Sequence, residues 1–185
     1  MFHIFEVDIP LIKDFELLTN FKDLGFKVLL PILLVLIIAG FIGFERQNIG
    51  KAAGVSSHVL VALSATGIAI INRLMFDYQL GLSFAGIEAR PEGQRLIAQV
   101  IAGVGFIGAG VILKDRDNII RGLTTAATVW SVAIIGIILG SGYLVTGTVL
   151  GIIIILFIVI RDLRRNINPF KPLHDERKGI LHYDE

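Results

Sequence analysis

The sequence contains no cysteine, little charge and almost no net charge. Because cysteine is absent from all 185 residues, disulfide bonds, cysteine-ligated zinc and thiol catalysis are excluded. The formal net charge is only +1, so the chain lacks the basic surplus that neutralises nucleic-acid phosphates. We therefore expect no nucleic-acid partner.

Apolar residues are what the sequence has in excess. Hydrophobic residues make up 54% of the chain against 18% charged residues, and the mean hydropathy is +0.76. A soluble domain must cover itself with more charge than this, so we expect the lipid bilayer to surround the chain. The composition predicts an all-α membrane protein, a bundle of about five short transmembrane helices.

Five runs free of Asp, Glu, Lys and Arg are long enough to cross a bilayer, which takes ~20 mostly apolar residues and tolerates ~17. They are residues 28–44, 55–71 with an extension to 75, 96–113, 123–139 and 143–160. The link Gly140-Ser141-Gly142 makes the last two spans an antiparallel hairpin. We expect three segments: residues 1–27 as an external leader, loosely ordered or carrying an interfacial helix, residues 28–160 as the transmembrane domain, and residues 161–185 as a short basic cytoplasmic tail.

The Lys and Arg residues set the predicted orientation. Five spans place the termini on opposite sides, and the 17 Lys and Arg then divide into eleven on the C-terminal side and six on the other. By the positive-inside rule the C-terminal tail and the loops 45–54 and 114–122 face the cytoplasm, and the N-terminus lies outside.

Small residues mark the predicted contact faces, because helices in a bilayer associate through close backbone approach. The second span carries a stripe at helical spacing that we expect to face the bundle: His58, Ala62, Ala65, Ala69 and Asn72. The predicted packing glycines are Gly43, Gly103, Gly105, Gly108 and Gly110. Since the third span has small residues on two faces, we expect it to lie centrally. Residues 103–108 match G-x-G-x-x-G but sit within a span rather than at a strand-to-helix turn, so we expect no nucleotide site there.

Polar residues inside spans are costly and therefore point to function. They are His58, Gln99, Thr124, Thr125, Thr128 and Ser131. No Asp or Glu lies deep in any span, which argues against a magnesium path through one subunit, because Mg²⁺ needs hard oxygen ligands. No nucleophile is paired with His58, so we expect no enzymatic activity, no metal and no cofactor.

Three blocks carry a resemblance to a known family. They are residues 43–47, GFERQ, continuing to 50–58, GKAAGVSSH; residues 95–110, RLIAQVIAGVGFIGAG; and residues 121–130, RGLTTAATVW. In this order and spacing they resemble the membrane domain of the MgtC/SapB family, over residues 34–140. Relatives commonly have an arginine where residues 55–57 read VSS, and an aspartate where Glu92 is the nearest match. Many also carry a soluble C-terminal regulatory domain, which we do not expect here.

The resemblance implies a bacterial cytoplasmic-membrane protein linked to adaptation to low magnesium and to virulence, in some members through a direct effect on the ATP synthase. Two functions remain open. One is a regulator that binds another membrane protein, with a homo-oligomer as a further option, and the other is an oligomeric transporter or channel for magnesium or another small ion.

The predicted functional site lies at the cytoplasmic face, where the three blocks meet. Its residues are Glu45, Arg46, Arg121, Thr124 and Thr125, with His58 and Gln99 behind them. Thr124 or Thr125 is expected to cap the fourth span, whose positive N-terminal end attracts either Glu45 or an external anion. Glu45 is then a candidate partner for Arg121. The alternative is that these charges only anchor helix ends and form ordinary ion pairs.

Overall fold

The computed structural model describes residues 20–84, 93–114 and 118–170, which are helical except for one short strand pair. Four of the helices are long and apolar enough to cross a membrane, and a fifth apolar helix is shorter. The prediction of an all-α bundle of about five membrane helices is confirmed.

The first span is one continuous helical run from Phe21 to Asn48. It comprises α2 (Phe21–Leu24), the π-helical turn η1 (Gly25–Leu29) and α3 (Leu30–Asn48). The remaining elements are α4 (Val55–Phe84), α5 (Gly93–Val111), β1 (Leu113–Lys114), β2 (Ile120–Arg121), α6 (Leu123–Gly140) and α7 (Leu144–Arg164). Helices therefore begin within the predicted leader and end beyond the predicted second and fifth spans. The apolar-run criterion identifies the part of a helix that suits lipid, whereas backbone hydrogen bonding continues through the charged residues beyond it.

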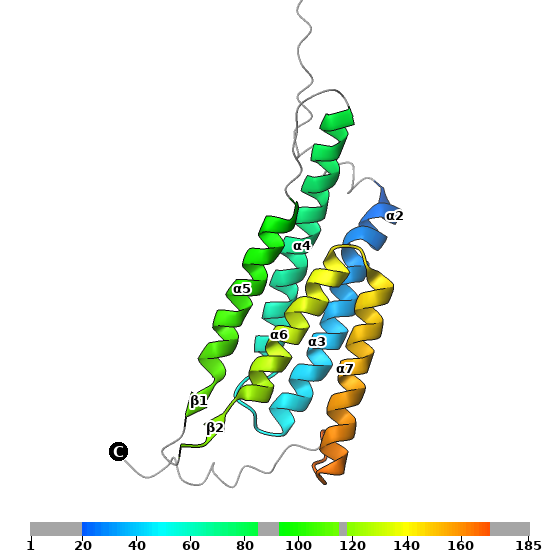
Figure 1. The fold of residues 1–185 in the computed structure, drawn as a ribbon. Coiled ribbons are helices and arrows are strands. Elements are labelled where there is room, and N and C mark those ends of the chain that lie inside the picture. The colour runs from blue at the N-terminus through cyan, green and yellow to red at the C-terminus, as the bar shows by residue number, and fades with distance from the viewer. Residues whose placement is uncertain (1–19, 85–92, 115–117, 171–185) are drawn as a thin grey trace, which may run out of the picture.

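The long helices alternate in direction, so one end of the bundle collects the last turns of α3, α5 and α7 and the first turns of α4 and α6 (Figure 1). We call this the hairpin end, because the antiparallel pair β1–β2 lies there, with Leu113 paired to Arg121 and Lys114 to Ile120. The segments that carry the three motif blocks meet at this end.

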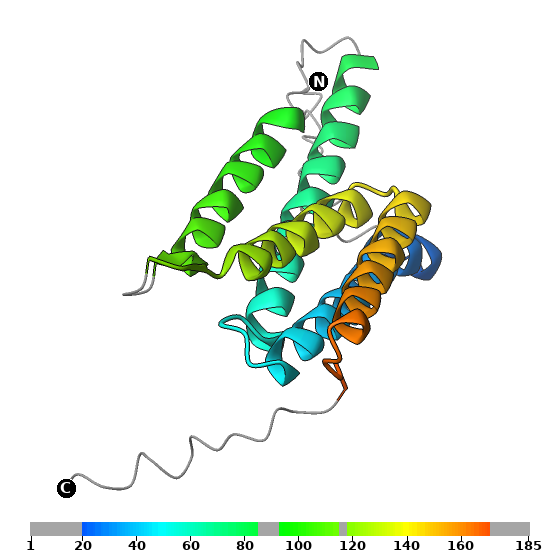
Figure 2. The same cartoon turned by 60° about the horizontal axis from the view of Figure 1, so that its bottom comes forward.

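Helix α6 is the centre of the bundle and packs against α3, α4, α5 and α7. Helix α5 lies at the edge, with α4 and α6 on one side of it (Figure 2). The expectation that the third span is central is therefore wrong. The close backbone approach belongs to α6, where a Cβ on Gly136 would lie 2.6 Å from the Ala62 carbonyl oxygen and one on Gly140 would lie 2.5 Å from that of Thr66.

The small-residue stripe of α4 faces the bundle, as predicted. His58, Ala62 and Ala69 are fully buried, Ala65 is almost so, and Asn72 is half-buried. The apolar core lies around it in two clusters. One joins α3, α4, α6 and α7 and includes Val35, Ile42, Ala62, Ile135 and Ile158, and the other joins α4, α5 and α6 and includes Ala65, Ala69, Val104, Ala133 and Ile137.

At the end of the bundle opposite the β1–β2 pair, Arg73 of α4 contacts the first span. Pro31 has no N–H, so it cannot donate to the carbonyl of Lys27 as an α-helix would require. The guanidinium of Arg73 donates to that carbonyl instead. At the same end, Gly142 closes the predicted α6–α7 hairpin with a φ of +96°, a conformation that favours glycine.

Candidate functional site

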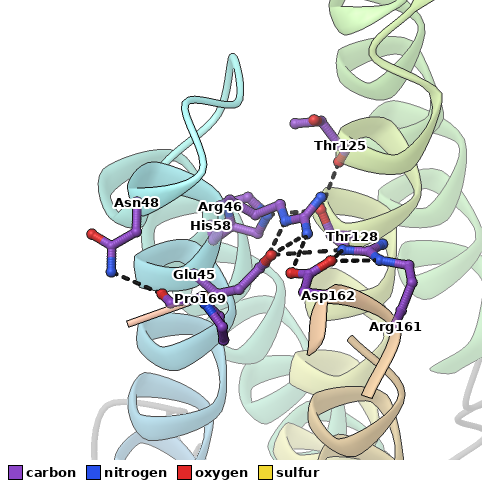
Figure 3. Close-up of polar contacts among 9 residues, drawn as sticks. All are labelled: Glu45, Arg46, Asn48, His58, Thr125, Thr128, Arg161, Asp162 and Pro169. Carbon is purple, nitrogen blue, oxygen red and sulfur yellow. Dashed lines mark hydrogen bonds and ion pairs between the residues drawn. The ribbon is translucent and has the colours of Figure 1, made fainter. Parts of the chain in front are cut away.

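Four charged side chains form a buried cluster at the hairpin end of the bundle (Figure 3). Glu45 and Arg46 occupy the last turns of α3, and Arg161 and Asp162 occupy the last turn of α7. Arg46 is 0% exposed, and Glu45 and Asp162 are each 1% exposed. Because α3 and α7 both end at this face, their charged termini meet.

The four groups form a closed ring of alternating charge, which we call the charge ring. Arg46 donates from Nε and Nη2 to the two carboxylate oxygens of Glu45, and its Nη2 lies 3.6 Å from Asp162 Oδ2. Arg161 Nη2 lies 2.7 Å from Asp162 Oδ1 and 3.6 Å from Glu45 Oε1. Each cation therefore contacts both anions, and the formal charge of the ring is zero.

The charge ring can be buried because its positive and negative charges balance. Removing an ion from water costs several kcal/mol, and only close pairing with opposite charge offsets this. One carboxylate oxygen of the ring is less well paired than the others. Asp162 Oδ2 is buried, has no hydrogen-bond partner among the described residues and relies on its contact with Arg46. Loss of any one member would leave an uncompensated charge in the bundle.

The chain after α7 folds back and ties this end of the bundle to α3. Asn48 Nδ2 donates to the carbonyl oxygen of Pro169 at 3.0 Å, and the rings of Phe41 and Phe170 meet edge to face with centroids 6.1 Å apart. The two contacts hold α7 beside α3, which is the arrangement that the charge ring needs.

A hydrogen-bonded chain of two side chains and two backbone carbonyls lies beside the ring and joins α4 to α6. His58 Nδ1 lies 2.8 Å from the Gly54 carbonyl oxygen, and its Nε2 lies 3.0 Å from Thr128 Oγ1. The Thr128 hydroxyl in turn donates to the Thr125 carbonyl oxygen at 2.9 Å. Because the Gly54 carbonyl can only accept, the proton of neutral His58 lies on Nδ1, and His58 Nε2 is then an acceptor that competes with the Thr125 carbonyl for the single Thr128 hydroxyl proton.

An open cleft of about 620 Å³ lies on the other side of Thr125, between the α3–α4 connection, the end of α5 and the start of α6. We call it the hairpin cleft. Its lining includes Lys51, Arg121, Thr124 and Thr125. The first-turn N–H groups of α6 lie at this cleft, and the α6 N-cap is Gly122, which supplies no side-chain cap.

The predicted site thus divides into two neighbouring parts. Glu45 and Arg46 belong to the charge ring with His58 beside it, whereas Arg121, Thr124 and Thr125 line the hairpin cleft. Gln99 joins neither, since it is exposed on α5 and lies ~18 Å along the helix from Val111 at 1.5 Å per residue.

Two expected interactions are replaced by others. Glu45 pairs with Arg46 and Arg161 rather than with Arg121. Gly122, with a φ of +89°, begins α6 in place of a threonine cap, and a Cβ there would overlap the Val111 carbonyl. The topology predicts which helix ends lie near one another. It does not predict where each side chain points, and so it does not predict which residues pair.

Sequence reasoning missed Asp162, Arg161 and Lys51 as site residues. Arg161 and Asp162 follow the last apolar run and read as the start of the tail. The one local signal is that Asp162 is an acid in a basic stretch, next to Arg161 and shortly before Arg164. An acid among basic residues indicates a buried ion pair only if helix α7 is known to extend past Asp162.

Of the predicted packing glycines, two make contacts within the chain. A Cβ on Gly43 would lie 2.6 Å from Val55 Cα, and one on Gly108 would lie 3.7 Å from the Ala126 carbonyl oxygen. A Cβ on Gly103, Gly105 or Gly110 would meet no described atom within 4 Å. All three lie on the exposed side of α5, with Gly103 and Gly110 on one flank and Gly105 on the other, because successive helical residues are rotated by ~100°.

Among the described residues, no group of three or more His, Asp or Glu side chains is arranged to hold a metal ion. The fold and the site together define a class: a multi-pass membrane protein whose helix ends are joined by a buried, neutral ring of charges. A model of the MgtC family matches residues 32–166. The chain therefore belongs to the MgtC family.

Three relatives illustrate the match. YhiD of Escherichia coli (strain K12), which is provisionally named a magnesium transporter, is 42% identical over 116 residues, or 63% of this chain and 52% of its own. Protein MgtC of Brucella abortus (strain 2308) is 34% identical over 119 residues, 64% of this chain and 44% of its own. Protein SapB of Bacillus subtilis (strain 168) is 34% identical over 116 residues, 63% of this chain and 48% of its own. The chain spans about half the length of these relatives, and no solved structure matches it.

Proposed function

We propose that this protein is a regulator in the bacterial cytoplasmic membrane that supports adaptation to low magnesium by binding another membrane protein. The observation that carries the proposal is the outer side of α5, where exposed glycines meet no other described residue. The ATP synthase, which the family resemblance implies, is the first candidate for the partner.

The two faces of α5 differ in what they contact. Gly108 packs on Ala126 of α6, whereas Gly103, Gly105 and Gly110 have no described atom within 4 Å of a Cβ position. Phe106, on the same outer side, is 83% exposed. Glycine weakens a helix by ~1 kcal/mol relative to alanine, and packing within this chain does not offset that cost. Small residues at a lipid-facing surface suit close approach by a helix of another membrane protein.

The charge ring supports a regulator more than an ion carrier. Each of its two cations is already in contact with both of its anions; Glu45, Arg46 and Asp162 are buried and Arg161 is half-buried. A carrier for a divalent cation needs oxygen ligands that can exchange with water. The ring carboxylates are instead used to join α3 to α7.

The uneven distribution of Lys and Arg supports an orientation with the hairpin end in the cytoplasm. In that orientation the charge ring and the hairpin cleft lie at the cytoplasmic surface. A partner held by α5 within the bilayer would then reach both.

A second candidate function is an oligomeric magnesium transporter, in which several copies surround a path. The observation that favours it is the relative YhiD of Escherichia coli (strain K12), whose provisional name is that of a magnesium transporter. In this case the free face of α5 would contact a second copy of the chain rather than a different protein.

Affinity purification from native membranes tests the partner surface. We expect the tagged protein to retain a membrane-protein partner, and Gly103→Leu with Gly110→Leu, two positions on one flank of α5, to lose the partner and the support of growth in limiting magnesium. Gly40→Leu on α3 is the matched control, because a Cβ at Gly40 also meets nothing within 4 Å. If the α5 variants keep both the partner and the growth phenotype, the proposed surface is wrong. If only copies of the chain co-purify, the oligomeric alternative is favoured.

A further inference from the structure

The hairpin cleft has the size and polarity of a ligand site. At about 620 Å³ it has room for ~20 water molecules of ~30 Å³ each, so it is far larger than a packing defect. Lys51 reaches it from the α3–α4 connection and Arg121 from β2. Among the described lining residues these two are charged, and neither charge is negative. The formal charges that the described lining brings to the cleft are therefore both positive.

Hydrogen-bond donors at the start of α6 add to this charge. The N–H groups of Leu123, Thr124 and Thr125 have no helical partner, and no acceptor from the described residues bonds to them. The positive end of the α6 dipole lies at the same place. Helix termini with such free N–H groups commonly bind anions, but a terminus alone does not establish a site.

Thr125 supplies an independent indication. Its side chain is 98% buried, since its exposed fraction is 2%, and it lines the hairpin cleft. Its carbonyl accepts from Thr128, whereas its hydroxyl has no hydrogen-bond partner within the described ranges 20–84, 93–114 and 118–170. The side chain extends from α6 toward the α3–α4 connection, which forms the facing wall (Figure 3). The oxygen of this hydroxyl is not fully enclosed, because Asp162 Oδ2 is the fully buried side-chain atom without a partner among the described residues, so it reaches the cleft and can donate there to a ligand that accepts a hydrogen bond.

We propose that the hairpin cleft binds a phosphate group. A phosphate offers several acceptor oxygens and a negative charge, which match two cations, the Thr125 hydroxyl and the free N–H groups of α6. The rest of the lining is apolar, with Val111, Leu113 and Ile120 beside the polar part. The same chemistry is carried by an anionic phospholipid headgroup at the membrane surface and by a soluble phosphate ester. This site is distinct from the α5 face and does not depend on it.

Binding measurements on the purified full chain test the proposal. In one arm, protein in phosphatidylcholine nanodiscs is titrated with inorganic phosphate and with glycerol 3-phosphate by calorimetry. In the other arm, native mass spectrometry measures retention of phosphatidylglycerol after reconstitution in mixed lipid. We expect Thr125→Val and Lys51→Gln each to weaken binding about tenfold, the loss typical of one charge-assisted hydrogen bond.

Two controls separate loss of binding from loss of fold. Thr125→Ser keeps the hydroxyl and is expected to retain the affinity of the wild type. Arg164→Gln removes an exposed charge at the same end of the bundle but outside the cleft, and is expected to leave binding unchanged. Binding in the first arm identifies a soluble phosphate and binding in the second a lipid headgroup. No binding in either arm, or binding that Thr125→Val and Arg164→Gln weaken equally, would overturn the proposal.

Discussion

Arg46 of α3 faces Asp162 of α7 across the hairpin end of the bundle, with Nη2 3.6 Å from Oδ2. The Asp162 oxygen in this contact has no hydrogen bond, so the Arg46 charge is what compensates its burial. The contact closes the charge ring and makes the position of α7 depend on the last turns of α3.

Asp162→Asn is expected to destabilise the protein by ~3–5 kcal/mol, because it leaves two guanidinium groups to share the single carboxylate of Glu45 and one positive charge uncompensated. The double variant Asp162→Asn with Arg161→Gln restores neutrality and is expected to recover part of the loss. The thermal unfolding midpoint in detergent measures both. The control is Asp23→Asn, which removes an exposed ion pair with Lys27 and should cost only ~0–1 kcal/mol. Equal midpoints for Asp162→Asn and Asp23→Asn would show that the ring contributes nothing to stability.

The charge ring also changes the expectation for Glu45→Gln. If Glu45 served only the predicted functional site, this variant would stay folded and lose function alone. Because Glu45 is 1% exposed and pairs with two arginines, its neutralisation should lower stability as well. Arg121 is exposed at the hairpin cleft, so Arg121→Gln is expected to leave stability unchanged and to test function alone. Growth in limiting magnesium is the measurement.

Gly140→Ala is expected to destabilise the bundle by ~1–3 kcal/mol, the usual cost of overpacking. Its Cβ would lie 2.5 Å from the Thr66 carbonyl oxygen and 2.8 Å from Ala69 Cβ, and neither the α4 backbone nor a Cβ can move aside easily. Gly67→Ala, where a Cβ meets nothing within 4 Å, should be neutral or slightly stabilising because alanine favours a helix. Chemical or thermal unfolding in detergent compares the two, and a Gly140→Ala variant as stable as Gly67→Ala would contradict the close α4–α6 contact.

Thr128→Val is expected to cost ~1–3 kcal/mol, because it leaves the buried His58 Nε2 without its partner while preserving shape. Ser131→Ala is the matched control on the same helix, since the Ser131 hydroxyl donates to the Ala127 carbonyl of α6 itself. Unfolding midpoints again provide the measurement. A larger loss in Ser131→Ala than in Thr128→Val would mean that the His58–Thr128 contact is not formed.

Reporter fusions test the proposed orientation. A reporter fused after residue 160 is expected to read cytoplasmic, and one inserted near residue 86 is expected to read external, by the distribution of Lys and Arg. The opposite pattern would place the hairpin end outside the cell and would show that the orientation inferred from the Lys and Arg residues is wrong.

Features set by local periodicity or by a short turn could be predicted from the sequence. The α4 stripe from His58 to Ala69 follows from helical spacing alone, and the α6–α7 hairpin follows from the turn at Gly142. Both depend on residues close in the chain, whose relation is fixed by helix geometry.

Features that depend on which helices are neighbours could not be predicted. Small residues on two faces of α5 indicate that helices can approach it, but not whether those helices belong to the same chain. The sequence therefore predicts a central α5, whereas the helix lies at the edge. The role of Asp162 is hidden for the same reason: its compensating charge, Arg46, is on a helix far away in the sequence.

The central claim is that the protein acts by binding a partner and not by carrying magnesium. The most direct measurement is Mg²⁺ flux into liposomes containing the purified protein. The tagged form used for purification must first be shown to support growth of cells in limiting magnesium. We predict flux no faster than in protein-free liposomes, whether or not a proton gradient or membrane potential is applied. Saturable Mg²⁺ flux that requires the protein would contradict the claim and establish the transporter alternative.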